Sequence, residues 1–262
     1  MQSRILIIDA FADRPLSGNP AAVCPLSTWI AEEVMQAIAA EMNLSETVFF
    51  VCKDGEYEIR WFTPTREVDL IGHATLAAGA FILNELEPDS SHVRFSSKGA
   101  DLEVKRGGEG DYIIDMPSLK PQLLSDPADG LIKGLGHRPS EIWAAKHYLC
   151  VFDKPDDVAQ LSPDFAILAG LDLPAVIVTA AGFEEFDFVS RFFAPANGVP
   201  EDPVSGVAHC CLTPFWAERL RKDVLLGRQL SHRGGVVRCR VKGDRVQLEG
   251  KVAVFLDGWV RY

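Results

Sequence analysis

Two segments of this chain repeat the same residue pattern, and the repeat limits how the chain can fold. The segments are residues 60–81 and 191–215. Each begins with Arg, an aromatic residue, Phe, one further residue and Pro, and each later places Gly-x-Ala ahead of a final Phe. The pattern predicts a strand that ends at the Pro, a loop, and a helix that begins at Gly72 or Gly206. We therefore expect two similar halves, each presenting a helix N-terminus to a shared cleft.

The start of each predicted helix is a candidate binding site for an anion. Backbone N–H groups in the first turn have no partner within the helix, and the helix dipole adds partial positive charge there. Such a terminus binds carboxylate, phosphate or sulfate groups. Gly72 and Gly206 are therefore expected to offer backbone donors to an anionic ligand. The alternative interpretation is that each Gly only begins a helix.

Composition restricts the class of protein and the class of partner. The chain has 262 residues, enough for one large domain or two of ordinary size. Hydrophobic residues make up 47% and charged residues 24%, as in ordinary globular proteins. The formal net charge of −11 argues against nucleic acid or an anionic membrane surface as the main partner. A small anionic substrate is still compatible with this charge, because a cleft can be locally positive.

The cysteines indicate a reducing compartment rather than a disulfide framework. The six are Cys24, Cys52, Cys150, Cys210, Cys211 and Cys239. None forms a C-x-x-C pair, and a chain of this size needs no disulfide to hold its core. The first residues lead into an apolar strand without a basic leader, and no apolar run reaches about 18 residues. We therefore expect a cytoplasmic protein that does not span a membrane.

Short apolar runs predict strands in both parts of the chain. In the first part these runs are residues 5–10, 21–26, 47–51, 56–62, 93–97, 102–105 and 112–115. In the second part they are residues 148–152, 175–180, 186–193, 236–241, 245–248 and 252–256. Residues 117–121, with Pro at both ends, predict the crossover between halves. The halves are then 1–117 and 118–250, and the last strand, within 251–262, can return to the first half.

One predicted helix dominates each half. Residues 73–86 and 207–220 are rich in apolar side chains, and the first helix is apolar on nearly all sides, which is typical of a buried central helix. Further helices are predicted at 29–42, 126–135, 155–161 and 163–171. Thr28 is expected to cap the first of these, and Asn43 to end it. The predicted fold class is α+β, with two pseudo-symmetric halves, each a curled mixed sheet around a central apolar helix.

The common cofactor and nucleophile motifs are absent from the sequence. There is no G-x-G-x-x-G after a strand, no Walker loop, no G-x-S-x-G elbow and no H-E-x-x-H. His209, Cys210 and Cys211 are adjacent on a predicted helix, so their side chains diverge and a metal site there is not expected. Acid–base chemistry by carboxylates and His, with helix termini that hold an anion, is the remaining interpretation.

Five segments, taken in order along the chain, carry a family signature. They are DAFADRPLSGNPAAVC, MNLSETVFF, FTPTREVDLIGHATLAAG, RFFAPANGVPEDPVSGVAHC and HRGGVV. Together they resemble the PhzF family of phenazine-biosynthesis-like isomerases over nearly the whole chain. The resemblance implies a diaminopimelate epimerase-like fold and a cofactor-free, metal-free isomerase, typically a homodimer. In the type reaction of this family, a carboxyl group moves a proton across a small cyclic dienoic amino acid.

The resemblance also implies which residues act. Glu46 matches the catalytic carboxylate of the family, His73 its active-site histidine and Asp202 its active-site aspartate. Gly72 and Gly206 supply the backbone donors that face the substrate. The first turn of a helix disfavours positive charge, so the position of His73 would keep its imidazole neutral and able to pass a proton.

One position departs from the family pattern. Better-known members carry a hydroxyl residue after the second-half Gly, and this chain carries Val207. The side-chain donor is lost and the backbone N–H is kept, so the substrate is expected to differ from that of phenazine synthesis. Residues 18–20 (Gly-Asn-Pro) match another family signature, which we interpret as structural.

Two other classes of function stay open on the sequence. The first is an amino-acid epimerase on the same fold, which needs a thiol at each helix terminus. Those positions hold His73 and Val207, and Cys210 and Cys211 lie a turn inside the predicted helix. The second is a non-catalytic binding module, which Val207 favours and the retained Glu46 disfavours. Uptake of deuterium from solvent into a small acid separates an enzyme from a binding protein.

Overall fold

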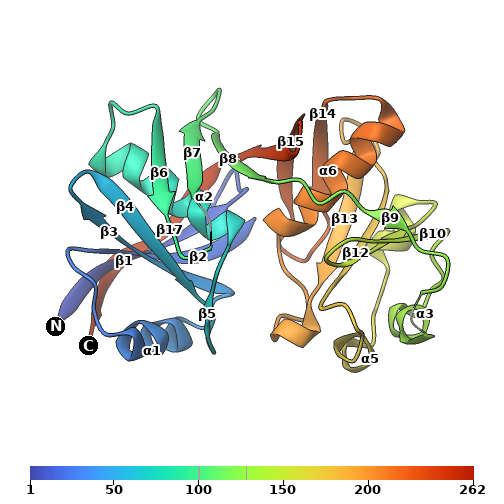
Figure 1. The fold of residues 1–262 in the computed structure, drawn as a ribbon, viewed down its shortest axis with the longest axis horizontal. Coiled ribbons are helices and arrows are strands. Elements are labelled where there is room, and N and C mark those ends of the chain that lie inside the picture. The colour runs from blue at the N-terminus through green and yellow to red at the C-terminus, as the bar shows by residue number, and fades with distance from the viewer. Residues whose placement is uncertain (100, 128) are drawn as a thin grey trace. The chain divides into compact units, whose positions relative to one another are not determined.

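The computed structural model describes residues 1–99, 101–127 and 129–262, and these form two compact units (Figure 1). Unit 1 contains Met1–Met116 and Leu248–Tyr262, and unit 2 contains Pro117–Gln247. Each unit combines a mixed sheet with a buried helix. The α+β class predicted from the sequence is therefore confirmed.

The sheet of unit 1 mixes parallel and antiparallel pairs. Its strands are β1 (Gln2–Ala10), β2 (Asn19–Leu26), β3 (Glu46–Lys53), β4 (Glu56–Phe62), β5 (Glu67–Val68), β6 (His92–Ser96), β7 (Leu102–Arg106), β8 (Tyr112–Pro117) and β17 (Val252–Arg261). Strand β1 pairs antiparallel with β2 and β17, and β2 pairs parallel with β3. Strands β3 and β4, β4 and β5, β6 and β7, and β7 and β8 are antiparallel, whereas β4 and β6 are parallel.

Helix α2 (Gly72–Phe81) is the central helix of unit 1, and it continues into a π-helical turn, η1 (Ile82–Leu86). Every residue of α2 is buried, and the helix contacts β1, β2, β3 and β7. Small residues permit this packing: a Cβ at Gly79 would lie 2.5 Å from the Cβ of Val104. The prediction of a buried central helix in the first half is confirmed.

Helix α1 (Glu32–Met42) begins three residues later than predicted, and Thr28 does not cap it. Its N-cap residue is Ala31, whose side chain makes no capping hydrogen bond. The predicted first residue, Trp29, instead donates its indole N–H to Glu58 at 2.8 Å, which holds the chain outside the helix. The predicted end is correct, because Asn43 adopts a left-handed conformation and its N–H bonds the carbonyl of Ala39.

Unit 2 has the same kind of mixed sheet. Its strands are β9 (Gln122–Leu123), β10 (Glu141–Ala144), β11 (Tyr148–Val151), β12 (Val176–Ala181), β13 (Phe188–Phe193), β14 (Val224–Gln229) and β15 (Gly235–Lys242), and β16 (Arg245–Gly250) leads back to unit 1. Strand β11 is parallel to β12, and β13 is parallel to β14. The pairs β9 and β10, β10 and β11, β12 and β13, and β14 and β15 are antiparallel.

Helix α6 (Gly206–Leu220) is the central helix of unit 2 and contacts β14 and β15. The Trp216 indole N–H, near its end, donates to Thr179 of β12 in the core. The shorter helices are α3 (Asp129–Leu135), α4 (Pro155–Ala159) and α5 (Phe165–Ala169), with a 3₁₀ turn, η2 (Pro195–Asn197). Both central helices begin at the glycines that the repeat indicated, Gly72 and Gly206.

Strands β10 and β14 were not predicted from the sequence. In β14 the sequence Val-Leu-Leu-Gly-Arg-Gln contains a glycine, which lowers strand propensity. The structure shows why Gly227 is there: a Cβ at this position would lie 2.3 Å from the ring of Phe188. Strand β2 also starts earlier than expected, because Asn19 and Pro20 pair with β1 instead of ending a loop.

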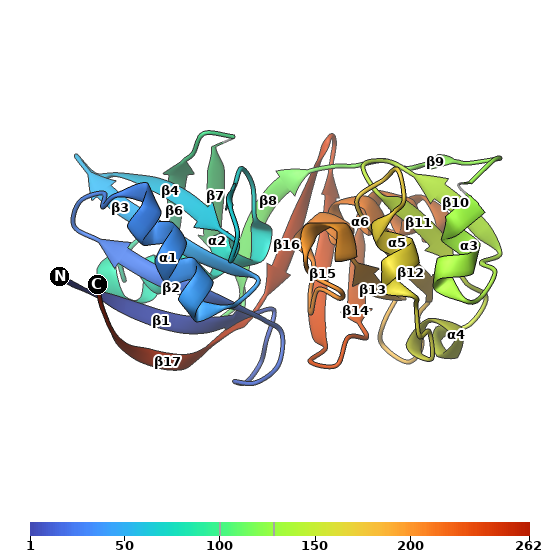
Figure 2. The same cartoon turned by 90° about the horizontal axis from the view of Figure 1, so that it is seen from below.

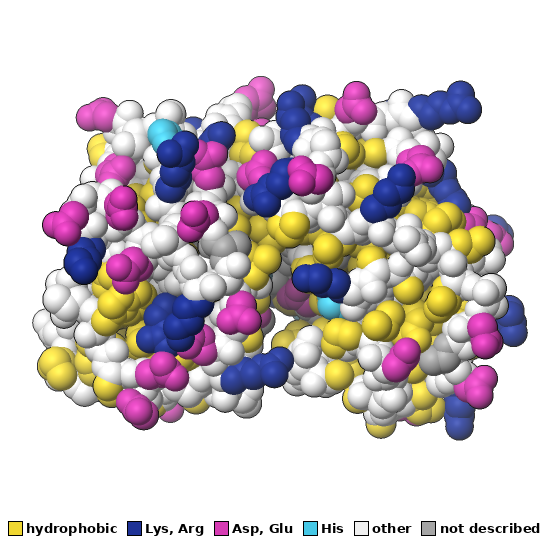
Figure 3. All heavy atoms as spheres, viewed as in Figure 1, with side chains coloured by type: hydrophobic (Ala, Val, Ile, Leu, Met, Phe, Trp, Pro, Cys, Tyr) yellow, Lys and Arg dark blue, Asp and Glu magenta, His cyan; other side chains and the backbone are white. Residues whose placement is uncertain are grey.

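The two ends of the chain lie side by side, because β1 pairs with β17 over its whole length (Figure 2). Tyr262 donates its N–H to the carbonyl of Met1 at 3.0 Å. Acidic and basic side chains are interspersed on the face seen in Figure 3. Helices in the described part of the chain are too short or too polar to cross a membrane.

Candidate functional site

In unit 1 the fold brings Glu46 and His73 together. Glu46 is the first residue of β3, and His73 is the second residue of α2. The His73 Nε2 atom lies 3.2 Å from Glu46 Oε2, and the two side chains are only 5% and 11% exposed. A carboxyl group and an imidazole nitrogen are therefore held in close contact inside the unit, at the end of a strand and the start of a helix.

The imidazole of His73 is neutral at physiological pH. Burial lowers the pKa of His73 to about 3, from an ordinary value of 6.5. A nearby carboxylate would favour the charged ring, but the loss of hydration in this position outweighs it, and the dipole of α2 acts in the same direction as burial. The contact with Glu46 therefore joins a carboxyl group to a neutral imidazole and is not an ion pair.

The N-terminus of α2 lies beside this pair. Its N-cap residue, Ile71, has an extended backbone and provides no side-chain cap within the described residues. The first N–H groups of the helix, including that of Gly72, are therefore not bonded to a capping side chain. The dipole and these donors favour a negatively charged group next to His73.

A second layer of polar residues lies behind Glu46. Ser45 donates its hydroxyl to Asn19 Oδ1 at 3.3 Å, and Asn19 is fully buried at the start of β2. Gly18, just before it, has a φ of 64°, and a Cβ there would lie 2.2 Å from the carbonyl oxygen of Ala10. Only glycine suits this position. The conformation of Gly18 agrees with the structural interpretation of residues 18–20. Asn19 also holds the segment that carries Glu46, through its bond with Ser45.

In unit 2 the fold gathers the other expected residues at the start of α6. Gly206 and Val207 are its first two residues, and Asp202 lies in the loop just before it. Ser205 caps the helix, because its hydroxyl accepts the Ala208 N–H at 3.3 Å. The Asp202 N–H donates to the carbonyl of Phe192 at 3.0 Å, which fixes the loop against β13. Asp202, Gly206 and Val207 therefore form one local group, as Glu46 and His73 do in unit 1.

The first residue of each repeat has the same structural role. In unit 1, Arg60 donates to both carboxylate oxygens of Glu67, at 2.6 and 2.7 Å. In unit 2, Arg191 donates to both oxygens of Glu201, at 2.7 and 2.9 Å. Each guanidinium also stacks on the Phe two residues later in the repeat, at 5.1 and 4.9 Å from the ring centres. Each Arg thus holds the loop that leads to the central helix.

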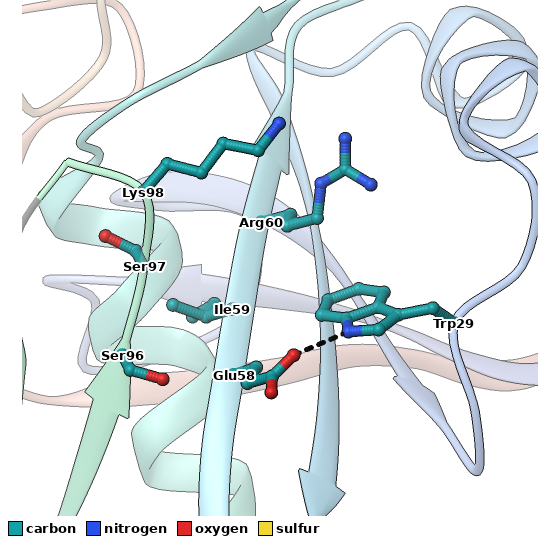
Figure 4. A pocket seen from close by; sticks show the side chains of 7 residues that line it. All are labelled: Trp29, Glu58, Ile59, Arg60, Ser96, Ser97 and Lys98. Atoms are coloured by element: carbon teal, nitrogen blue, oxygen red, sulfur yellow. Dashed lines mark hydrogen bonds between the residues drawn. The ribbon is translucent and has the colours of Figure 1, made fainter.

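A separate pocket of about 400 Å³ opens on unit 1 (Figure 4). Its lining residues are Trp29, Glu58, Ile59, Arg60, Ser96, Ser97 and Lys98. Arg60 and Lys98 both donate to Glu67, and the indole N–H of Trp29 donates to Glu58. The two basic side chains of this pocket are thus engaged with Glu67, and Glu58 is engaged with Trp29, so the pocket offers less to a ligand than the Glu46–His73 pair does.

The cysteines of α6 are not suited to acid–base work. Cys210 and Cys211 are buried, and burial raises the pKa of the Cys211 thiol to about 12. A thiol of this kind does not supply the thiolate that an epimerase of the cysteine type requires. Among the residues that the structure describes, no group of three or more His, Cys, Asp or Glu side chains could hold a metal ion.

Comparisons with known proteins agree with the family resemblance of the sequence. The sequence pattern of the family described as phenazine biosynthesis-like protein matches residues 8–258. An uncharacterized isomerase of Pseudomonas aeruginosa is 48% identical over 259 residues, which cover 98% of each chain.

Solved structures extend the comparison to the fold. A crystal structure of a phenazine biosynthesis protein of the PhzF family from Enterococcus faecalis matches with a TM-score of 0.95 at 41% identity, over 100% of both chains. A hydroxyproline epimerase from Agrobacterium vitis matches with a TM-score of 0.63 at 9% identity, over 99% of this chain and 92% of the epimerase. The second match shows a shared fold alone.

Proposed function

Because this chain belongs to the phenazine biosynthesis-like family, we propose that it is an isomerase that moves a proton on a small carboxylic or amino acid. The observation that carries the proposal is the buried contact of 3.2 Å between Glu46 and His73. A carboxyl group and a neutral imidazole are held in contact within unit 1. Positioned acid–base groups of this kind contribute roughly 10²–10⁴ in rate.

Glu46 is the proton carrier in this proposal. Its carboxylate takes a proton from one carbon of the substrate, the resulting carboxylic acid exchanges this proton with solvent, and it then delivers a proton to another carbon, so the product is an isomer and the enzyme is unchanged. His73 is neutral, so its ring can contact the carboxyl group of Glu46 without placing a buried positive charge beside it. The start of α2, which has no side-chain cap from Ile71, would bind a substrate carboxylate, because the positive end of the helix dipole attracts its negative charge.

Asp202 is proposed to act as the second acid–base residue of the family pattern. It lies in the loop before α6, which Phe192 and the cap residue Ser205 hold in place. Next to it, Val207 offers methyl groups and a backbone N–H in place of a hydroxyl. The preferred substrate is therefore proposed to carry an apolar group where the phenazine-type substrate has a hydrogen-bonding one.

Two copies of the chain are proposed to associate, as the family resemblance implies. Strand β17 leaves four large apolar side chains open to solvent. They are Val254, Phe255, Leu256 and Trp259, which are 51%, 51%, 40% and 65% exposed. A cluster of this kind on one strand favours contact with another protein surface.

Deuterium incorporation tests the proposed reaction directly. The protein is incubated in deuterium oxide with a small cyclic dienoic amino acid, and the acid is examined by mass spectrometry. Glu46→Gln keeps the shape of the side chain and removes the proton carrier, so incorporation should fall by at least about 10²-fold. The matched control is Glu58→Gln, which makes the same change at a carboxyl group on β4 that accepts a hydrogen bond from Trp29. Wild-type rates in Glu46→Gln would refute the assignment of Glu46.

A further inference from the structure

The loop that carries Asp202 is held by side chains from the end of strand β14. The Gln229 side chain is fully buried and bonds the loop at two points. Its Nε2 atom donates to the carbonyl of Asp202 at 2.6 Å, and its Oε1 atom accepts the N–H of Ser205 at 3.0 Å. One amide therefore satisfies backbone groups on both sides of the Pro203–Val204 segment.

Ser231, two residues beyond the end of β14, adds a third bond to the loop. Its hydroxyl donates to the carbonyl of Pro203 at 2.7 Å and accepts the N–H of Gly234 at 3.0 Å. Gln229 and Ser231 are two residues apart, and together they bond the backbone of Asp202, Pro203 and Ser205. We call Gln229 and Ser231 the β14 clamp.

The β14 clamp is attached to a rigid part of unit 2. Strand β14 lies between two neighbours, because Gln229 is in register with Ser190 of β13 and with Gly235 of β15. The far side of the loop is also fixed, because the His209 Nδ1 atom lies 2.7 Å from the carbonyl oxygen of Ser205 and donates its hydrogen to it. A side chain on such a strand can hold a loop to within the tolerance that a reacting group needs.

We propose that the β14 clamp positions Asp202 for catalysis. This inference rests on the proposed function, in which Asp202 is an acid–base residue. Gln229 and Ser231 bond the backbone on which the Asp202 side chain is mounted, so they act through Asp202 and do not touch the substrate themselves. The same bonds fix the turn into α6, so Gly206 and Val207 are held in place with Asp202.

Amide hydrogen exchange tests the clamp without any substrate. Gln229→Met removes both bonds and keeps the length of the side chain, so the Ser205 amide should exchange at least about tenfold faster than in the wild type. Gln229→Glu keeps an acceptor for Ser205 and removes the donor to Asp202. In that variant Ser205 should stay protected, and the Asp202 amide, which bonds Phe192, should exchange faster.

Two further variants separate the clamp from general loss of stability. Thr213→Val removes a buried bond to the carbonyl of His209, one turn further into α6, and leaves the clamp intact. After correction for global stability, its Ser205 amide should exchange as in the wild type. Ser231→Ala is the milder clamp variant, at a half-buried position, and should loosen the loop if Gln229→Met does not fold. Unchanged loop exchange in both clamp variants would overturn the inference.

A double-mutant cycle tests the link to catalysis, with deuterium incorporation into the cyclic dienoic amino acid as the readout. If Gln229 acts through Asp202, Gln229→Met should slow incorporation in the wild type and cost less than twofold in the Asp202→Asn background. Additive losses would show that Gln229 serves only the fold. A wild type that is inactive on this acid would contradict activity toward the phenazine-type substrate, whereas the exchange data would still decide whether the clamp holds the loop.

Discussion

The low pKa of His73 predicts that the protein loses stability when the pH falls below about 6.5. The folded chain keeps this imidazole neutral down to about pH 3, because the ring is buried and the charged form is poorly solvated there. The unfolded chain binds a proton at this residue near pH 6.5. Protons therefore favour the unfolded state through this window, and the stability present above pH 6.5 is lost as the pH falls.

The size of the effect follows from the shift. One pKa unit corresponds to about 1.4 kcal/mol, so His73 should remove about 3 kcal/mol of unfolding free energy between about pH 6.5 and 4.5. His209 is also buried, and its pKa is lowered to about 4, so it adds to the loss in the same direction. Carboxylates such as Glu67, whose pKa the bond from Arg60 lowers to about 2, lose their contribution at lower pH. The window above about pH 4.5 therefore reports mainly on histidine.

Urea unfolding at several pH values between about 7.5 and 4.5 measures the loss. His73→Gln should flatten the profile by about 3 kcal/mol over this range, because the variant has no imidazole to protonate in the unfolded state. His92→Gln, which removes an exposed imidazole on β6, is the matched control. The NMR titration of His73 in the wild type gives an independent reading. A His73 resonance that titrates with a midpoint near pH 6.5 would refute the argument.

The other two predictions concern the substrate and the assembly. Val207→Ser adds a hydroxyl at the start of α6 and should tighten binding of the cyclic dienoic amino acid by roughly one to two orders of magnitude, the value of a charge-assisted hydrogen bond. Isothermal titration of both proteins decides this, and weaker binding with a lower melting temperature would make Val207 a packing residue. Trp259→Glu places a charge among the apolar side chains of β17 and should convert a dimer to a monomer in sedimentation experiments. A monomeric wild type would contradict the proposed association.

The sequence predicts the elements with strong local signals and misses those that depend on distant contacts. The apolar circumference of 73–86 and the repeated Gly-x-Ala identify both central helices and their first residues. Strand β14 was missed because it contains Gly227, and glycine lowers strand propensity. The glycine is needed to make room for the ring of Phe188, a residue that is far away in the sequence. The start of α1 was misplaced for a similar reason, because Trp29 is bonded to Glu58 and not to its own helix.

In the candidate site, too, the sequence indicated some residues, and others became visible only in the structure. The family resemblance indicated Glu46 and His73, and the structure adds their contact and the cause of the low His73 pKa. Gln229 carried no signal in the sequence, because a lone polar residue at the end of an unpredicted strand has no distinctive neighbours. Its two bonds to residues 202 and 205 exist only once the sheet and the loop are folded.

The pairing of β1 with β17 has a consequence for how the chain is made. Unit 2 is one continuous segment, Pro117–Gln247, whereas unit 1 needs Leu248–Tyr262 to complete its sheet. On a ribosome, unit 2 can therefore fold while unit 1 still waits for the last residues to emerge. Because Met1 and Tyr262 are bonded neighbours, a short linker could join them, and new ends could be opened in an exposed loop. A permuted chain that begins at Asp244, in the exposed turn between β15 and β16, would complete unit 1 before unit 2 and so reverse this order, with the folded protein unchanged.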